Sequence, residues 1–174
     1  MTASLDHPAV RRVVEAAARR GVNLEIRAFP AGTHTALQAA RAVDAQLGQI
    51  VKSLVFFTVR EDEPLEPILC LVSGPNRVDT ARLGAFVGRS DIRKATAREA
   101  NELTGFVIGG IPPFGHERRL RVVMDPDLGR YTTVWAAAGL PDAVFPISPA
   151  SLRLLADAQV APIVEEAEPE IAAS

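Results

Sequence analysis

A run rich in glycine and proline, Gly109–His116, most constrains how this 174-residue chain can fold. It reads Gly-Gly-Ile-Pro-Pro-Phe-Gly-His and lies between two apolar segments, Phe106–Ile108 and Leu120–Met124, that we expect to be strands. The glycines leave the main chain accessible at both ends, whereas the two prolines fix φ and remove two N–H donors. Such a loop suits the binding of a small oxygen-rich group by main-chain N–H groups, although a rigid surface turn has the same composition.

The composition is that of one ordinary globular domain. Hydrophobic residues make up 48% of the chain and charged residues 23%. The net charge of −2 argues against strong nonspecific nucleic-acid binding but leaves room for a local basic face. No apolar run reaches membrane-spanning length and the start lacks a signal-peptide pattern, so we expect a cytoplasmic protein without membrane association. We expect residues 1–164 to form a single domain and the acidic residues 165–174 to be a disordered tail.

Caps and hydrophobic periodicity predict the secondary structure. Helices are expected to begin at Asp6 with Pro8 in the first turn, and at Thr35, Asp79, Thr96 and Ser148. Strands are expected at Leu24–Phe29, Ser53–Val59, Ile68–Val72, Phe106–Ile108, Leu120–Met124, Thr132–Ala136 and Ala143–Ile147. Hairpins are mixed with helices instead of alternating with them, which favours an α+β fold: a compact mixed β-sheet or partial barrel flanked by helices.

Lysine is rare in this chain, which has 17 arginines but only Lys52 and Lys94. Lys94 lies among arginines and needs no special explanation. Lys52 lies at the start of the most apolar strand, on the face of Leu54 and Phe56. An ammonium group there is partly desolvated unless it reaches outward or binds an anion, so Lys52 is a candidate functional residue.

The other reactive side chains give weaker signals. His7 is expected at the surface. His34 lies at a helix N-terminus, where it could either lie beside a bound anion or assist the helix cap. His116 could reach a ligand held by the loop or pair with Glu117. Cys70, inside an apolar strand, is expected to be a buried structural thiol.

Several classes of site are not supported by the sequence. The histidines lack metal-ligand spacing, so we expect neither a metal nor a cofactor. There is no G-x-S-x-G elbow, the serines lie in capping or turn contexts, and both the P-loop and the zinc-deaminase signature are missing. The remaining candidates are one cation, Lys52, and the main-chain N–H groups of the Gly109–His116 loop. Together they can bind an ester or a phosphate, and they can stabilise the oxyanion that forms when water attacks the ester.

Those two elements resemble, in this order, the YbaK/prolyl-tRNA-synthetase-associated family of aminoacyl-tRNA editing domains. Val51-Lys52-Ser53-Leu54-Val55 is similar to the family's catalytic-lysine strand, and Gly109–Gly115 to its glycine-proline loop. The segment Arg118–Asp125 resembles its basic-to-apolar strand, and the element order is similar from about Pro8 to about Leu155. The resemblance implies hydrolysis of the ester that links a wrong amino acid to the tRNA 3′ end, with the substrate's 2′-hydroxyl helping to activate water.

The resemblance, read with the residues, assigns candidate roles. Catalysis is expected from Lys52, Gly109 and Gly110. Substrate binding is expected from Ile111, Pro112, Pro113, Phe114, Gly115, His116, Thr33 and His34. Contacts to the tRNA are expected from Arg118, Arg119, Arg93 and Lys94. The implied partner is the 3′ acceptor end of a tRNA, with an aminoacyl-tRNA synthetase as a second candidate.

The sequence departs from several members of the family at two positions. Val144 stands where they carry an acidic residue near the site, and Asp142 is a candidate substitute from the preceding turn. Phe114 also replaces a leucine common in the loop. Both changes bear on which amino acid is accepted more than on the reaction.

The leading hypothesis is a free-standing deacylase that removes a small misattached amino acid such as alanine, cysteine or serine. A noncatalytic module of the same fold that binds tRNA or a synthetase is the alternative. An esterase or amidase acting on small metabolites is a third. The sequence leaves the amino acid, the tRNA and the oligomeric state open.

Overall fold

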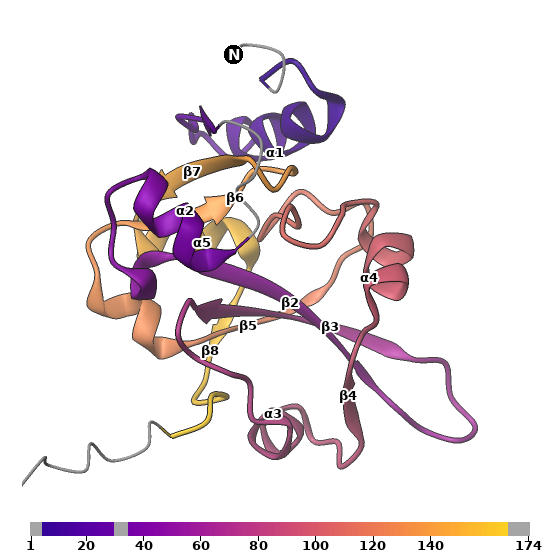
Figure 1. Cartoon of the computed structure of the whole chain (residues 1–174). Helices are drawn as coiled ribbons and strands as arrows, with labels where there is room; N and C mark the ends of the chain where they lie inside the picture. The colour runs from indigo at the N-terminus through magenta and orange to yellow at the C-terminus, as the bar shows by residue number, and fades with distance from the viewer. Residues whose placement is uncertain (1–4, 30–34, 167–174) are drawn as a thin grey trace, which may run out of the picture.

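The fold is α+β, with helices packed around two β-sheets. The computed structural model describes residues 5–29 and 35–166, and Figure 1 shows how the elements follow one another. The helices of this part of the chain are α1 (Pro8–Ala18), α2 (Ala36–Ala42), α3 (Thr80–Val87), α4 (Ala97–Thr104) and α5 (Pro149–Ala156), with the 3-10 helices η1 (Leu47–Gln49) and η2 (Pro126–Arg130). The α+β class predicted from the sequence is confirmed.

The strands form two sheets. The larger one has the order β4-β2-β3-β5-β8 and the smaller one the order β1-β7-β6. In the larger sheet, β5 runs parallel to both β3 and β8, whereas β2 is antiparallel to its two neighbours. The bounds are β1 (Arg27–Ala28), β2 (Val51–Thr58), β3 (Glu66–Ser73), β4 (Ile92–Lys94), β5 (Arg121–Met124), β6 (Val134–Ala137), β7 (Ala143–Ile147) and β8 (Gln159–Val160).

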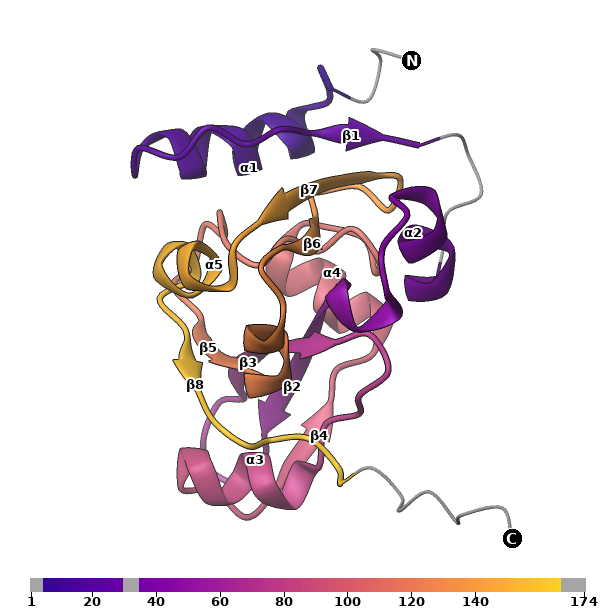
Figure 2. The same cartoon turned by 90° about the vertical axis from the view of Figure 1, so that its left-hand side faces the viewer.

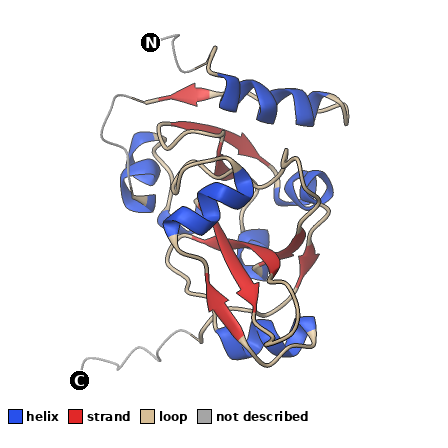
Figure 3. Ribbon diagram, turned by 90° about the vertical axis from the view of Figure 1, so that its right-hand side faces the viewer, coloured by secondary structure: helices blue, strands red, loops and turns tan. Residues whose placement is uncertain are grey.

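The two sheets meet at the start of β2. An isolated bridge between Ile50 and Trp135 connects this point to β6. In two views, α1 lies at one end of the molecule beside the smaller sheet and α3 lies at the opposite end next to β4 (Figures 1 and 2). Figure 3 shows the same arrangement from the other side, with β1 beyond the N-terminal end of α1.

The larger sheet is buried on both faces. One face packs in the main core with α1, α5 and the smaller sheet, and the other packs against α3 and the C-terminal segment. This explains why the sequences of β2 and β3 are apolar without alternation. Cys70 lies on the α3 face with no exposed surface, and burial raises the pKa of its thiol to about 12. The prediction of a buried structural thiol is confirmed.

Most predicted helix starts are confirmed by their caps. Thr35 and Thr96 each form a capping box, with Gln38 and Glu99 respectively, and the Asp79 carboxylate accepts from two N–H groups of α3. The prediction of Asp6 as the first cap was wrong. The N-cap of α1 is His7, whose Nδ1 accepts from the Ala9 N–H at 3.1 Å.

The strand predicted at Phe106–Ile108 does not form. Gly105 ends α4 with φ +76°, and the chain then turns, closed by the Gly110 N–H donating to the Val107 carbonyl at 2.9 Å. The strand beside β3 is β5, which aligns parallel to it. The strand predicted at Leu24–Phe29 shrinks to the two residues of β1, and the sequence did not predict β4 or β8.

The C-terminal end of the described chain is held by α3 and the residues before it. The Glu165 N–H donates to the Arg77 carbonyl, and Glu166 forms an ion pair with Arg82 at 2.9 Å. The first two residues of the predicted disordered tail are therefore bound, while 167–174 lie outside the described residues. Among the described helices, none combines the length and apolar character needed to cross a bilayer.

Candidate functional site

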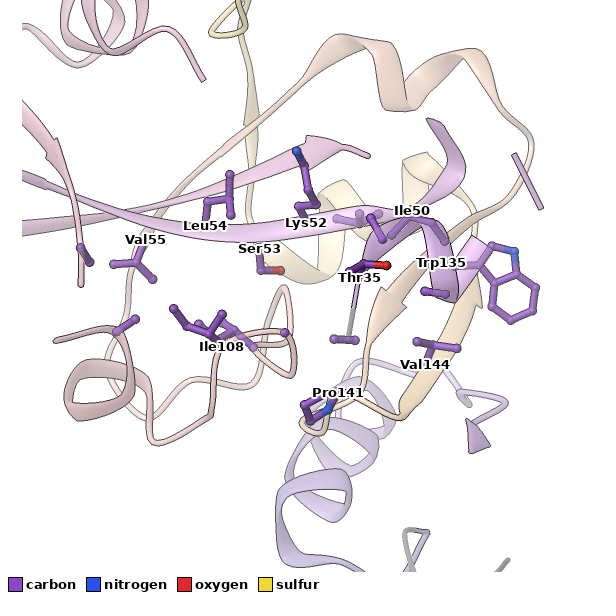
Figure 4. Close-up of a pocket in the computed structure, with 18 of the residues that line it drawn as sticks. Thr35, Ile50, Lys52, Ser53, Leu54, Val55, Ile108, Trp135, Pro141 and Val144 are labelled. Carbon is purple, nitrogen blue, oxygen red and sulfur yellow. The ribbon is translucent and has the colours of Figure 1, made fainter. Parts of the chain in front are cut away.

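A cavity of about 240 Å³ lies where β2, α2 and the loop after α4 meet the smaller sheet. Its walls are mostly apolar, and the polar side chains among the described residues that line it are Thr35, Lys52, Ser53 and Lys94. Figure 4 shows Ile108 and Pro141 opposite β2 across the cavity, with Val144 contributed by β7. Both lysines of the chain thus line one cavity, although nothing in the sequence pattern distinguished Lys94 from the arginines around it.

Lys52 is held by a network of hydrogen bonds. Its ammonium group donates to the Asn76 carbonyl at 2.5 Å, and the Asn76 side-chain amide donates to Asp125 and Asp127 at 2.8 Å each. Asp125 is fully buried and also accepts from the Ser73 N–H. The network ties the lysine to the turn after β3 and to the end of β5.

The Lys52 ammonium group lies close enough to two other cations, Lys94 and Arg77, for their charges to interact. Burial lowers the pKa of Lys52, and the nearby charges of Lys94 and Arg77 lower it further, against a smaller opposing effect of Asp125. Cations close together are stabilised when an anion binds between them. The Lys52 side chain leaves β2 on the same side as Leu54, as predicted, and away from Ile108 (Figure 4).

Ser53 extends from the other side of β2, toward Ile108 (Figure 4). Its hydroxyl is buried and has no hydrogen-bond partner among the described residues. From the sequence, the serines were expected in capping or turn contexts, and no motif distinguished Ser53 from the others. Strand alternation next to a functional lysine is the signal that could have found it.

The predicted loop divides between two environments. Gly109 and Ile111 line the cavity with Lys52, whereas Pro113, Phe114, Gly115 and His116 line a separate groove beside α5. Pro112 is buried and accepts a hydrogen bond from His116. Within the loop, only the end formed by Gly109 and Ile111 lines the same cavity as Lys52.

Gly110 has a packing role. Its N–H already donates to the Val107 carbonyl, so it is not free to bind an oxyanion as predicted. A Cβ at this position would lie 2.9 Å from the main chain of Leu140. Gly110 therefore allows the loop to lie directly against the turn between β6 and β7.

His116 faces the core. Its Nε2 donates to the Pro112 carbonyl at 2.8 Å, and its ring packs edge-on against Phe106. Burial lowers the pKa of His116, and the nearby Arg12 lowers it further. It does not pair with Glu117, whose carboxylate lies 4.0 Å from Arg12.

The predicted tRNA contacts differ in availability. Arg93 forms an ion pair with Glu99 at 2.7 Å and lies over the Phe57 ring, whereas Lys94 is exposed at the cavity. Arg118 and Arg119 are exposed and line the groove on the other side of the loop. The predicted substrate-binding residues Thr33 and His34 lie outside the described residues.

The position that departs from the relatives lies at the cavity. Val144 lines it, whereas Asp142 is not among the lining residues and its carbonyl accepts from the Phe29 N–H. Asp142 therefore does not supply the missing carboxylate, and this wall of the cavity is apolar.

Comparison with known proteins identifies the family of the chain. The family model described as "Aminoacyl-tRNA editing domain" matches residues 30–155, which contain β2, the loop and β7. The chain belongs to this family. The editing domain is also similar to a solved structure of a proposed trans-editing enzyme for prolyl tRNA synthetase, with 46% identity and a TM-score of 0.83, covering 92% of this chain and 99% of that one.

Curated relatives of the editing domain are of two kinds. The "Multifunctional Ser/Thr-tRNA deacylase ProXp-y" of Escherichia coli is 32% identical, over 66% of this chain and 71% of that protein. A "Proline–tRNA ligase" of Limosilactobacillus fermentum is 27% identical over 56% of this chain, and the match spans only 17% of the ligase. The family thus includes short proteins as well as segments of much longer synthetases.

Proposed function

We propose that this editing domain is an aminoacyl-tRNA deacylase that hydrolyses the ester between a small misattached amino acid and the 3′ end of a tRNA. The observation that carries the proposal is the cavity shared by Lys52, Gly109 and Ile111. Lys52 lines it beside these two loop residues, while its ammonium group lies on the other side of β2, where it donates to the Asn76 carbonyl (Figure 4). Membership of the family and the deacylase name of one relative support the same reaction.

The side chains of the cavity favour water as the nucleophile. No carboxylate or imidazole is found among the described residues that line it, so Ser53 has no neighbouring base to activate it. Attack by water on the ester carbonyl places negative charge on its oxygen. The resemblance to the family implies that the 2′-hydroxyl of the terminal ribose helps to activate that water.

The two lysines have a role in binding the tRNA end. Lys52 and Lys94 both line the cavity, and the effect of Lys94 on the pKa of Lys52 indicates that their charges interact. A phosphate or the developing oxyanion at this point would be attracted by both. The Gly109 end of the loop is the remaining candidate for main-chain hydrogen bonding to the aminoacyl group, because the Gly110 N–H is engaged and Gly115 lies outside the cavity.

The direct test is hydrolysis of a panel of mischarged tRNAs by the wild type, Lys52→Ala and Lys52→Arg. We expect Lys52→Ala to lower kcat/KM by about 10²–10³-fold, the loss typical of one well-placed electrostatic contact. Arg60→Ala is the matched control, since that cation is paired with Glu63 and does not line the cavity. Hydrolysis unaffected by Lys52→Ala would remove Lys52 from the mechanism, and a wild type inactive on the whole panel would favour the binding-module alternative.

The pH dependence gives a second test. Only the protonated ammonium form of Lys52 attracts an anion, and its pKa is lowered by burial and by Lys94 and Arg77. We therefore expect kcat/KM to decline with rising pH at a lower pH than an exposed lysine would give. Lys94→Ala removes one of the lowering charges, so the decline should move to higher pH.

A further inference from the structure

The main-chain groups of Ser53 face away from β3. Ser53 lies opposite Leu71 in the antiparallel pair of β2 and β3, and the Leu71 carbonyl accepts from the Asp125 N–H at 2.8 Å, on the β5 side of β3. Residues directly opposite each other in such a pair exchange both main-chain hydrogen bonds or neither. The N–H and the C=O of Ser53 therefore point to the opposite side of β2. Two residues further along, the Val55 carbonyl points the same way and accepts from the Ala95 N–H at 2.9 Å.

Within the described chain, no strand pairs with β2 at Ser53. β4 covers β2 only at Phe56–Thr58, and β6 is bridged to the residue before β2 through Ile50 and Trp135. Between these two points, no described residue forms a hydrogen bond with the N–H or the C=O of Ser53. Main-chain polar groups of folded proteins are nearly always paired, so this free N–H and C=O are available to a molecule in the cavity.

The exposed surface of Ser53 belongs to its main chain and its Cβ. The residue lines the cavity and is partly exposed, whereas its hydroxyl oxygen is buried. A ligand in the cavity therefore contacts the strand edge itself and not the hydroxyl. The side chain of Ile108 lies across the cavity from this edge (Figure 4).

The edge fits one residue of an extended peptide. In a hydrogen-bonded antiparallel pair, each residue donates its N–H to the C=O of the other. An aminoacyl ester carries the same two kinds of group on one amino acid, an α-amino donor and a carbonyl acceptor. No carboxylate lines the described cavity, so a main-chain carbonyl is the acceptor that β2 offers to the amino group. Addition of an extended segment to an open strand edge is a recurring mode of peptide recognition.

We propose that the main-chain edge of Ser53 binds the aminoacyl group of the substrate as a one-residue extension of the sheet. The Ser53 C=O accepts from the α-amino group, and the Ser53 N–H donates to the ester carbonyl oxygen. The inference rests on the proposed deacylase function and names the protein groups that orient the ester in that same site. It adds a strand edge to Gly109, the candidate main-chain group within the loop.

The consequence is a division of roles within the cavity. The edge of β2 recognises what all amino acids share, so the choice between side chains falls to the apolar walls, which include Ile111, Pro141 and Val144. The Ser53 N–H also stays directed at the carbonyl oxygen when attack by water makes that oxygen negative.

The first test changes the substrate and leaves the protein intact. Alanyl, lactyl and propionyl esters of one and the same tRNA differ only in the α substituent, which is an amino group, a hydroxyl group or hydrogen. We divide kcat/KM for each ester by its uncatalysed rate of hydrolysis. The alanyl and lactyl esters should then be alike and the propionyl ester about tenfold slower, the worth of one hydrogen bond. A propionyl ester hydrolysed as fast as the alanyl ester would overturn the role of the Ser53 C=O.

The second test changes the N–H. Lactic acid incorporated at position 53 replaces the N–H with an ester oxygen, and Ser53→Ala, with the same side chain and an ordinary peptide bond, is its matched control. We expect lactic acid to lower kcat/KM about 10²-fold relative to Ser53→Ala, equally for alanyl and seryl tRNA, because the lost donor faces the carbonyl oxygen. Lactic acid in place of Ser90, an exposed residue outside the cavity lining, should leave kcat/KM unchanged.

Two results of the second test would contradict the proposal. Activity equal to that of Ser53→Ala would overturn the role of the N–H, and so would a loss on only one of the two esters. The substrate series needs no variant, so it remains decisive if the ester bond weakens the sheet.

A binding measurement separates this inference from the proposed reaction. The alanyl and propionyl amides of 3′-amino-3′-deoxyadenosine lack the ester bond and can be titrated without turnover. We expect the wild type to bind the alanyl amide about tenfold more tightly. This preference without hydrolysis of any ester would reject the deacylase and retain the binding edge, whereas ester hydrolysis with equal affinities for the two amides would reject the edge alone.

Discussion

The two ends of the glycine-proline loop are next to each other in sequence but belong to different parts of the molecule. At one end, Gly109 and Ile111 face the cavity that also contains Lys52. At the other, Phe114 packs in the core against Phe145, with ring centroids 5.7 Å apart, and His116 closes back onto Pro112. One end is accessible to a ligand, and the other is anchored.

This difference shows how a short loop can form a firm cavity wall. A wall that discriminates between amino acids of similar size must not relax, because one methylene in an apolar pocket contributes only about 1–3 kcal/mol of discrimination. The anchored end supplies that rigidity, and the composition of the loop alone does not show which end does so. The following changes separate anchoring from ligand contact.

The largest effect on stability is expected for Phe114→Ala. Phe114 is 5% exposed, and removing a buried aromatic ring costs about 3–5 kcal/mol of unfolding free energy. Urea unfolding followed by circular dichroism measures this loss. Phe86→Ala, at a ring on the surface of α3, should cost much less. Lost activity with unchanged stability would place Phe114 in the substrate site instead of the anchor.

Gly110→Ala tests the contact between the loop and the β6–β7 turn. The new Cβ would lie 2.9 Å from the Leu140 main chain, so one backbone segment must move, at about 1–3 kcal/mol. Because Gly109 and Ile111 flank this position, we expect kcat/KM to fall as well. Gly129→Ala is the control, since no atom lies within 4 Å of a Cβ there. If both substitutions are equally tolerated, the close approach of the two turns is not needed.

Ile111→Val changes the cavity end with little effect on the anchor. Ile111 is buried and lines the cavity, so losing one methyl group should cost about 0.5–1.5 kcal/mol of stability. The added space should raise kcat/KM for the larger threonyl ester relative to the seryl ester. Steady-state kinetics on the two esters measures the ratio, and an unchanged ratio would show that Ile111 does not limit substrate size.

The smallest effect is the pH dependence contributed by His116. Its folded-state pKa is lowered, chiefly by burial, so the unfolded chain binds more protons between that lowered pKa and the ordinary value near 6.5. The contribution of His116 to stability is therefore present above pH 6.5 and lost as the pH falls through its folded pKa. In His116→Gln, unfolding free energy should depend less on pH in this window. A slope equal to that of the wild type would show that His116 does not titrate differently on folding.

The local features of the fold could be predicted from short stretches of sequence. The caps at Asp79, Thr96 and Ser148 and the strand at Ala143–Ile147 depend on residues within a few positions of one another, and all were predicted. The burial of Cys70 followed from the apolar run around it. The order of the lysine strand and the glycine-proline loop was enough to indicate the family, since both motifs are contiguous.

Tertiary structure decided which groups meet. Phe106–Ile108 has strand-like residues but forms a turn, and the strand that pairs with β3 is β5, which is far from β3 in sequence. The convergence of Lys52 and Lys94, the network through Asn76 to Asp125, and the open edge at Ser53 all depend on contacts between distant segments. Periodicity predicts which face of a strand a side chain occupies, but what lies opposite that face is fixed only when the sheets pack.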